Sequence, residues 1–405
     1  MQRPIKDRYD LLRQNIAKFV FDKKTRQNKS EAFDISGVKS VLFLRNDNKI
    51  GDMAVSSCLF REIKLKYPNI KIFVLCGKDN KEIIKHNPYV DEIITLKQSF
   101  IANLILFKKL GTQKFSLVAD FLPLKPKPAY LLMLRLLNPV FLTGFYKKSY
   151  NLYDFSFEEN LFNKHITQYY KLFLNFLGIE NPSLKYDLFL GAQEDEAKKI
   201  TEPLVKAGIK IITINPFAAS KHRTMSIEKI KELSNLITGS LAANKIKCKF
   251  FILAEYGKAK QTDFGENIKP CHSGLDPESI LPSCRKTWTP FFNGASLRSD
   301  LDTGDNLSLF ISKSILESAA LIKFSDLIIS PDTSIVHIAA AFNKKLVALY
   351  LDYSQQTEKT NIIWGPNYAN ASQICLDRQN GTLSNDVENI PNALIAEKAV
   401  KLLSN

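Results

Sequence analysis

Two polar turns carry the residue types and spacings that are best suited to chemistry. One covers residues 45–52 (RNDNKIGD) and the other residues 330–337 (SPDTSIVH), and each joins an apolar run of strand type to a segment of helical pattern. Free amide groups and the helix dipole favour an anion at a turn of this kind. The sequence therefore predicts two anion-holding turns, one in each half of the chain.

Asp52 is the residue of the first turn that could act on a proton. It falls in the first turn of a predicted helix, where the dipole favours the ionised carboxylate, and Gly51 would let the chain turn tightly just before it. A carboxylate in this position can take the proton of an attacking hydroxyl group. Asp52 could instead serve only as a helix cap, which is a common role for aspartate.

The second turn combines a helix start with a histidine. Asp332 and Thr333 can cap the predicted helix, and the amide groups of residues 333–335 can hold a phosphate. His337 lies four residues after Thr333, on the same face of the helix, and could add a hydrogen bond to such a phosphate. A lone histidine on a helix is usually structural, so both interpretations stay open.

Two more charged residues follow strand-type runs in the second half. Lys221 can meet a diphosphate as a compact positive charge and stabilise a leaving group, although a solvated basic loop would look the same. Glu255 can accept hydrogen bonds from a ribose diol, or can be an ordinary exposed carboxylate.

These turns need a scaffold, and the hydrophobic pattern predicts one. Apolar runs alternate with amphipathic segments, which indicates parallel sheets covered on both faces by helices. Strands are predicted at residues 38–44, 70–75, 92–96, 115–120, 210–215, 249–254, 326–330 and 346–351. Helices are predicted at residues 52–67, 78–86, 100–110, 165–177, 194–207, 226–241, 314–323 and 392–403.

The predicted fold class is α/β, with two Rossmann-like, doubly wound domains that face each other across a cleft. Residues 1–190 would form the acceptor-binding domain and residues 191–405 the nucleotide-binding domain. One stretch does not fit, because residues 269–306 are rich in Pro, Gly, Ser and Asp and have no periodicity. We expect a disordered insertion there, and we attribute its Asp300-Leu-Asp302 metal-type motif to chance.

Composition limits the partners. The chain has 405 residues, 45% of them hydrophobic, and its formal net charge of +15 favours phosphorylated substrates or an anionic membrane face. It has no arginine-rich stripe or aromatic-basic platform, which predicts no nucleic-acid partner. The six cysteines and five histidines are dispersed, which predicts reduced cytosolic thiols and no metal site.

Two apolar segments bear on membrane association. Residues 129–145 are too short to span a bilayer and are interrupted by Arg135 and Pro139. Residues 1–24 have the pattern of a basic amphipathic helix, which could bind an anionic membrane surface. The same helix could instead pack on the protein's own core. We expect a cytoplasmic monomer that can associate peripherally with the inner membrane.

Taken together, these segments resemble the ADP-heptose:lipopolysaccharide heptosyltransferase family, glycosyltransferase family 9. The motifs that carry the resemblance lie at residues 41–53, 67–68, 87–92 and 326–340. The resemblance implies a GT-B fold, with Arg45 and Gly51 on the acceptor side and Asp52 as the general base. It also implies Lys221 near the diphosphate, Glu255 at the nucleoside, and Asp332, Thr333, Ser334 and His337 around the donor.

The chain departs from the family pattern at two places in the donor half. Ser334 replaces a glycine, and a backbone that needs a positive φ there would be strained by the added Cβ. Arg223-Thr-Met225 stands where the family often has Trp-Pro. Both changes bear on the identity of the donor.

The resulting hypothesis is a metal-independent, inverting glycosyltransferase without a cofactor. Its donor substrate would be ADP-heptose or a related ADP-sugar, and its acceptor a lipid-linked or lipopolysaccharide core-type sugar. Two alternatives stay open: a nucleotide-sugar epimerase with a similar two-domain fold, and a non-catalytic nucleotide-sugar-binding relic.

Overall fold

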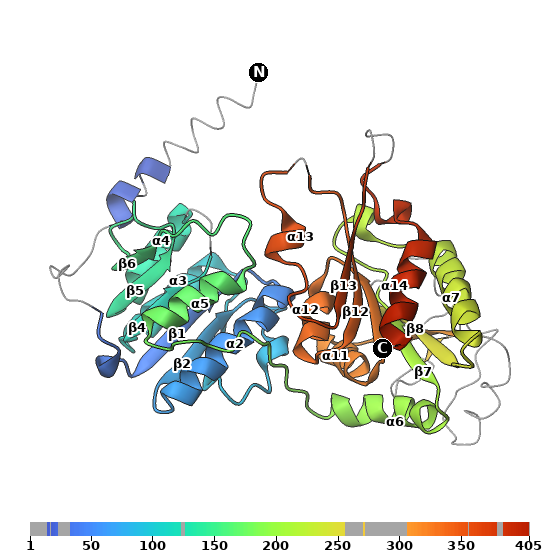
Figure 1. Ribbon diagram of the computed structural model, residues 1–405. Coiled ribbons are helices and arrows are strands. Elements are labelled where there is room, and N and C mark those ends of the chain that lie inside the picture. The colour runs from blue at the N-terminus through green and yellow to red at the C-terminus, as the bar shows by residue number, and fades with distance from the viewer. Residues whose placement is uncertain are drawn as a thin grey trace. The chain divides into compact units, whose positions relative to one another are not determined.

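The computed structural model describes residues 14–16, 18–22, 33–122, 126–255, 270–271, 306–354, 356–378 and 384–404 (Figure 1). The chain divides into two compact units. Unit 1 is Met1–Phe162 with Ile166–Leu184, and unit 2 is Asn163–His165 with Lys185–Asn405. The division after Leu184 precedes the predicted boundary at residue 190, and a short segment of the first half belongs to unit 2.

Unit 1 is built on a six-stranded sheet in the order β3-β2-β1-β4-β5-β6, and all its strand pairs are parallel. The strands are β1 (Ser40–Arg45), β2 (Lys71–Cys76), β3 (Glu92–Thr95), β4 (Leu117–Asp120), β5 (Phe141–Phe145) and β6 (Phe155–Phe157). The helices are α2 (Ile50–Lys66), α3 (Phe100–Gly111), α4 (Pro128–Leu137) and α5 (Thr167–Phe176), with short 3-10 turns η1 (Ile35–Gly37) and η2 (Glu82–Ile84). The middle residues of β1 are fully buried on both faces, as expected when helices cover both sides of a parallel sheet.

Unit 2 has a seven-stranded parallel sheet in the order β13-β12-β11-β7-β8-β10-β9. The strands are β7 (Lys210–Ile214), β8 (Cys248–Glu255), β9 (Pro270–Cys271), β10 (Leu307–Ser312), β11 (Leu327–Pro331), β12 (Lys345–Tyr350) and β13 (Ala371–Cys375). The helices are α6 (Gln193–Lys206), α7 (Ile227–Ala242), α11 (Ile315–Phe324), α12 (Ser334–Ala341), α13 (Thr360–Ile363) and α14 (Asn392–Ser404), with 3-10 turns η3 (Lys221–Arg223) and η7 (Val387–Asn389).

Near the centre of each sheet is a point where the strand order reverses. In unit 1 it lies between β1 and β4, and in unit 2 between β7 and β11. The carboxyl ends of the two central strands meet at this point, since Leu44 of β1 pairs with Asp120 of β4 and Ile214 of β7 pairs with Ile329 of β11. Open α/β sheets bind ligands in the crevice at such a point.

The predicted α/β fold is confirmed, and several element predictions need correction. Residues 78–86 do not form a regular helix, because the side chain of Asn80 bonds to the amide of Gly77 and to the carbonyl of Arg45 and so competes with helical bonding. The elements α4, β5, β6, β10, α13 and β13 are not among the predicted ones. Two of them, α4 and β5, lie within residues 129–145, which have the pattern of a single apolar run.

The prediction of a disordered insertion is wrong for residues 270–271, which form the edge strand β9 beside β10. Most of the remaining insertion, with Asp300 and Asp302, lies outside the described residues. The predicted end of the insertion agrees with the start of β10 at Leu307.

Candidate functional site

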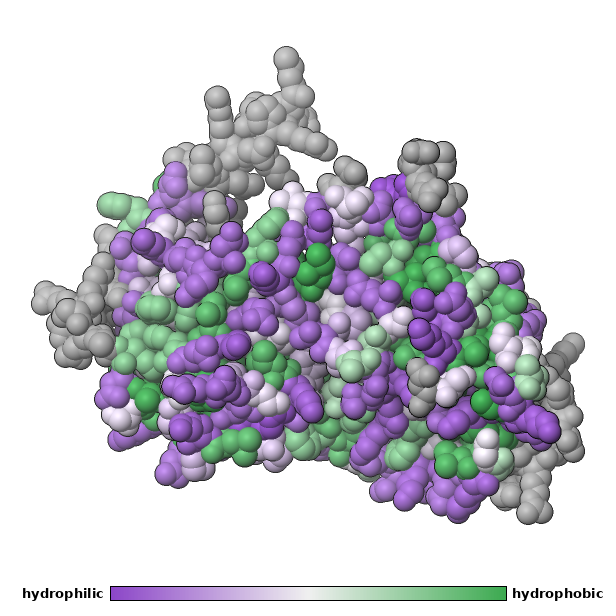
Figure 2. Space-filling view, in the orientation of Figure 1, coloured by the Kyte–Doolittle hydropathy of each residue, from purple (hydrophilic) through white to green (hydrophobic). Residues whose placement is uncertain are grey.

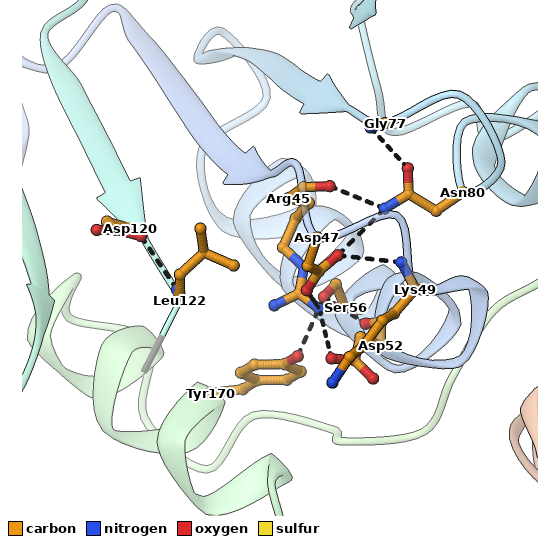
Figure 3. A network of polar contacts seen from close by, with 10 residues as sticks. All are labelled: Arg45, Asp47, Lys49, Asp52, Ser56, Gly77, Asn80, Asp120, Leu122 and Tyr170. Carbon is orange, nitrogen blue, oxygen red and sulfur yellow. Dashed lines mark hydrogen bonds and ion pairs between the residues drawn. The ribbon is translucent and has the colours of Figure 1, made fainter. Parts of the chain in front are cut away.

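In unit 1 the turn between β1 and α2 holds a buried cation between two carboxylates (Figure 3). Arg45 is 3% exposed, and its Nη2 lies 3.2 Å from Oδ2 of Asp47 and 3.4 Å from Oδ2 of Asp52. Burying a guanidinium is costly unless carboxylates lie close enough to pair with it, as Asp47 and Asp52 do here.

Asp52, the third residue of α2, does not cap that helix. The N-cap of α2 is Lys49, which makes no side-chain capping bond, and the amide of Lys49 donates to Oδ1 of Asp47 at 3.3 Å. Asp47 therefore takes the local turn-forming role, and the carboxylate of Asp52 faces Arg45 instead (Figure 3). The structure therefore does not support the alternative in which Asp52 serves only as a helix cap.

The surroundings of Asp52 suit a group that gains and loses a proton near neutral pH. Burial raises the pKa of Asp52 to about 6, against the opposing effect of the Arg45 charge and with a further rise from Asp47. A general base is most effective when its pKa lies near the working pH.

Distant parts of unit 1 hold this turn in place. Asn80, which follows β2, donates to the carbonyl of Arg45 at 2.8 Å and to Oδ1 of Asp47 at 3.3 Å. On the other side, Ser56 donates to the carbonyl of Asp52 at 2.8 Å and lies 3.1 Å from the hydroxyl of Tyr170 on α5. The sequence analysis named neither Asn80 nor Tyr170, because these contacts join segments far apart in the chain.

Gly51 does not have the predicted role. It is the second residue of α2, and the residue with a positive φ in this turn is Asn48, at φ 61°. Asparagine tolerates this left-handed conformation, and its side-chain oxygen accepts a hydrogen bond from the amide of Asp79 at 2.7 Å. The tight turn therefore depends on Asn48.

A second buried polar group lies at the end of the neighbouring strand β4. Asp120 is 1% exposed, accepts a hydrogen bond from Tyr153 and accepts another from the amide of Leu122 at 3.0 Å. Lys147, also buried, donates to the carbonyl of Leu122 at 2.9 Å. Burial raises the pKa of Asp120, and the charge of Lys147 opposes that rise. The sequence analysis missed this group, although Asp120 ends a strand that it predicted.

In unit 2 the turn after β11, which also lies where the strand order reverses, is rich in hydroxyl groups. Thr333 is the N-cap of α12, and its Oγ1 accepts from the amide of Ile335 at 3.3 Å. Asn215, which follows β7, donates from Nδ2 to Oγ1 of Thr333 at 3.1 Å and to Oγ of Ser330 at 3.0 Å. Asn215 thus joins the two strands at the point where the order of the sheet reverses, and the sequence analysis did not single it out.

Ser334 is accommodated without strain. It is the first residue of α12, and it is not among the residues with a positive φ in the described chain. The predicted conflict between its Cβ and the backbone conformation therefore does not arise, because this position is helical.

His337 is enclosed by aromatic rings of unit 2. It is 5% exposed, and its ring centroid lies 6.1 Å from that of Tyr186 and 6.0 Å from that of Trp364. Burial lowers the pKa of His337 to about 3, with a smaller contribution from His165. His337 is therefore neutral at physiological pH and can only offer a neutral hydrogen bond.

The remaining predicted residues are placed as follows. Asp332 forms an ion pair with Arg223 at 2.9 Å. Lys221 is an exposed residue at the start of η3. Glu255 ends β8, and its side chain lies outside the described part of the structure. The described residues contain no group of three or more His, Cys, Asp or Glu that could hold a metal ion.

Comparison with known proteins shows that this chain is similar to one family. Residues 306–389 match the model of glycosyltransferase family 9 (heptosyltransferase). The chain is 28% identical over 388 residues to "Putative lipopolysaccharide heptosyltransferase 4" of Escherichia coli K12, with 93% of each chain covered. The resemblance to this family that the motifs predicted is confirmed.

Solved structures share the fold. The crystal structure of the glycosyl transferase family 9 protein from Veillonella parvula aligns with a TM-score of 0.63 at 14% identity, covering 93% of this chain and 99% of the other. The E. coli ADP-heptose LPS heptosyltransferase II aligns with a TM-score of 0.60 at 14% identity, covering 90% and 98%. The predicted GT-B fold is thereby confirmed.

Proposed function

We propose that this chain, a GT-B glycosyltransferase that resembles family 9, transfers a heptose from a nucleoside-diphosphate donor to a lipopolysaccharide core-type acceptor, with inversion. The observation that carries the proposal is the position of Asp52, a mostly buried carboxylate held against Arg45 rather than used as a helix cap. The name of a structural relative, ADP-heptose LPS heptosyltransferase II, supports ADP-heptose or a related ADP-sugar as donor.

In the proposed reaction, Asp52 accepts the proton of the acceptor hydroxyl while the hydroxyl oxygen bonds to the anomeric carbon of the donor. The bond between that carbon and the terminal phosphate oxygen breaks, and its electron pair leaves with the nucleoside diphosphate. Because the attacking and departing oxygens lie on opposite faces of the carbon, the anomeric configuration inverts.

Unit 2 is proposed to hold the donor. The amide groups at the start of α12 and the exposed ammonium group of Lys221 would offset the charge on the departing diphosphate. This is charge that a metal ion supplies in other enzymes, so we propose a metal-independent transfer without a cofactor. Glu255 is proposed at the nucleoside, and neutral His337 at a donor oxygen.

Two measurements test the proposal. Thermal-shift screening with ADP-, UDP-, GDP- and CMP-sugars should show the largest rise in melting temperature with an ADP-sugar, because a ligand that binds only the folded state stabilises it. The preferred donor should then glycosylate a lipopolysaccharide core acceptor, and nuclear magnetic resonance of the product should show the inverted anomer. Interconversion of the sugar nucleotide without acceptor would instead support an epimerase, and binding without any turnover would support a non-catalytic relic.

We further propose that unit 1 binds an anionic membrane surface from the cytoplasmic side. None of the described helices is long and apolar enough to cross a membrane. Residues 18–21 are helical, and Phe19 is 74% exposed. Polar contacts hold this segment, since Arg135 donates to the carbonyl of Val20 and the amide of Leu152 donates to Asp22, each at 2.8 Å. Residues 1–13 of the predicted helix lie outside the described part.

Other apolar side chains are exposed on the same unit, including Ile101 and Ile105 on α3. Figure 2 shows hydrophobic groups interspersed with hydrophilic ones over the face of the molecule in view. Exposed apolar groups beside lysines favour the interface of an anionic bilayer, where each basic residue contributes about 1 kcal/mol. Sedimentation with phosphatidylglycerol vesicles should show binding at low salt that weakens at high salt and falls in Phe19→Ser. Binding that Phe19→Ser and removal of residues 1–24 leave unchanged would contradict this part of the proposal.

A further inference from the structure

An ion pair in unit 2 sits directly at the turn that is proposed to hold the donor. Nη1 of Arg223 donates to the backbone carbonyl of Asp332 at 3.0 Å and to its Oδ2 at 2.9 Å. The hydroxyl of Tyr353 donates to the same Oδ2 at 3.4 Å. Asp332 immediately precedes Thr333, the N-cap of α12. The carboxylate is thus fixed at the entrance to the helix N-terminus.

This placement creates an electrostatic problem for a diphosphate. Asp332 is 9% exposed, so water screens its charge poorly, and a nearby unpaired carboxylate would repel the phosphates that the α12 amide groups attract. Burial and the charge of Asp332 raise the pKa of Tyr353 to about 12, so Tyr353 stays neutral and cannot balance the carboxylate. A cation is needed to cancel the charge.

Arg223 is positioned to be that cation. Its side chain is 26% exposed, and the segment around it is anchored, because Met225 is fully buried and its amide donates to the carbonyl of Pro216 at 3.0 Å. The neighbouring His222 points elsewhere, since its Nδ1 lies 3.3 Å from Asp386 and its side chain is 66% exposed. The buried side chain of Met225 and its backbone hydrogen bond therefore anchor the segment that places Arg223 beside Asp332.

We propose that Arg223 is a positioning residue that neutralises Asp332 and thereby lets the N-terminus of α12 accept a nucleoside diphosphate. This inference rests on the proposed function. It also gives a physical meaning to the departure from the family pattern, because Arg223-Thr-Met225 provides one cation for the donor turn and one apolar anchor for the core of unit 2.

The test is a double-mutant cycle on the full chain, with ADP as the ligand and isothermal titration calorimetry as the measurement. Arg223→Met should weaken ADP binding about tenfold, because it removes the guanidinium charge paired with Asp332. Adding Asp332→Asn to that variant should restore binding to within about threefold of the wild type, since the repelling charge is then gone. Asp332→Asn alone should bind ADP at least as tightly as the wild type.

Three controls separate charge from folding. Arg223→Lys keeps the charge and should bind ADP nearly as well as the wild type, even if Arg223→Met proves unstable. His222→Gln alters the adjacent surface ion pair and should change nothing. Adenosine, which has no phosphate, should bind all variants equally.

The outcomes separate the two proposals. If the wild type does not bind ADP, the proposed donor is wrong, and the inference falls with it. If the wild type binds ADP but Arg223→Met binds it equally well, or the double variant stays as weak as Arg223→Met, the inference alone is overturned. The last result would mean that Arg223 acts through its own contacts rather than through Asp332.

Discussion

The turn after β1 and the turn after β11 each lie where the strand order of their sheet reverses, but they are built from different chemistry. In unit 1 a buried arginine lies between two carboxylates, and one of them, Asp52, has a pKa raised to about 6 by burial. In unit 2 the residues are hydroxyl and amide groups, a neutral histidine and a compensated ion pair. The same strand–turn–helix geometry can therefore present a proton acceptor in one unit and an uncharged anion cradle in the other.

The largest effect is expected when Asp52, the proposed proton acceptor of the turn after β1, is replaced. Asp52→Asn should lower turnover by about two to four orders of magnitude, the usual scale for a general base, with almost no change in ADP affinity. Steady-state and single-turnover kinetics would measure the loss. Asp47→Asn is the matched control, because Asp47 also pairs with Arg45, and its turnover should fall far less. Equal losses in both variants would assign the effect to the ion pair rather than to a base.

Stability should respond in the opposite sense to activity in Asp52→Asn. Because burial raises the pKa of Asp52 above its unfolded value, the stability that the protonated group contributes is lost as pH rises through about 6. Asparagine carries no charge, so the variant does not lose this stability as the pH rises. It should melt at the same or a higher temperature than the wild type at pH 7. A clear drop in melting temperature would indicate a structural role.

A second variant removes the buried cation of the turn after β1. Arg45→Met leaves Asp47 and Asp52 without their buried partner, which should destabilise unit 1 by about 3 kcal/mol. Urea unfolding would measure this change. Lys49→Met, an exposed neighbour in the same turn, should have an effect near zero. Wild-type stability in Arg45→Met would show that the carboxylates do not depend on the buried charge.

The smallest effect is expected for a deletion within the predicted insertion. Of the described structure, deleting residues 269–305 removes the two-residue edge strand β9 and keeps Asn306, whose carbonyl accepts from the amide of Phe250 at 2.7 Å. Residues 256–268 remain to connect β8 with β10. Calorimetry should show a change of no more than about 1 kcal/mol, because a long loop contributes little beyond closure entropy. A cooperative loss of unit 2 would show that the insertion is packed.

The alternation of strands and helices could be predicted from the sequence, because the spacing of apolar residues and the positions of Pro and Gly are local signals. Prediction failed where a side chain competes with the backbone for hydrogen bonds, as Asn80 does in residues 78–86. It also failed where one apolar run contains two elements, as residues 129–145 do. Asp332 and Thr333 follow a strand and precede α12, as the pattern predicts, and Asp52 lies in the first turn of α2.

The partners of these residues could not be predicted from spacing. Arg223 meets Asp332, and Asn215 meets Thr333, only because β7 and β11 are neighbours in the sheet, and strand order is not a local property. A partial signal existed, since Asn215 is the last residue of a predicted strand. Polar residues at the carboxyl end of every predicted strand would have been a better starting set.

The most direct test of the contrast between the two turns is one pH series, from pH 5 to pH 8, on the wild-type enzyme. The account predicts that the single-turnover rate of sugar transfer rises with pH through a pKa of about 6, because only ionised Asp52 accepts a proton. It also predicts that ADP affinity, after correction for the nucleotide's own titration, stays level, because His337 is neutral throughout this range. A flat transfer rate, or a donor affinity that titrates in its place, would contradict it.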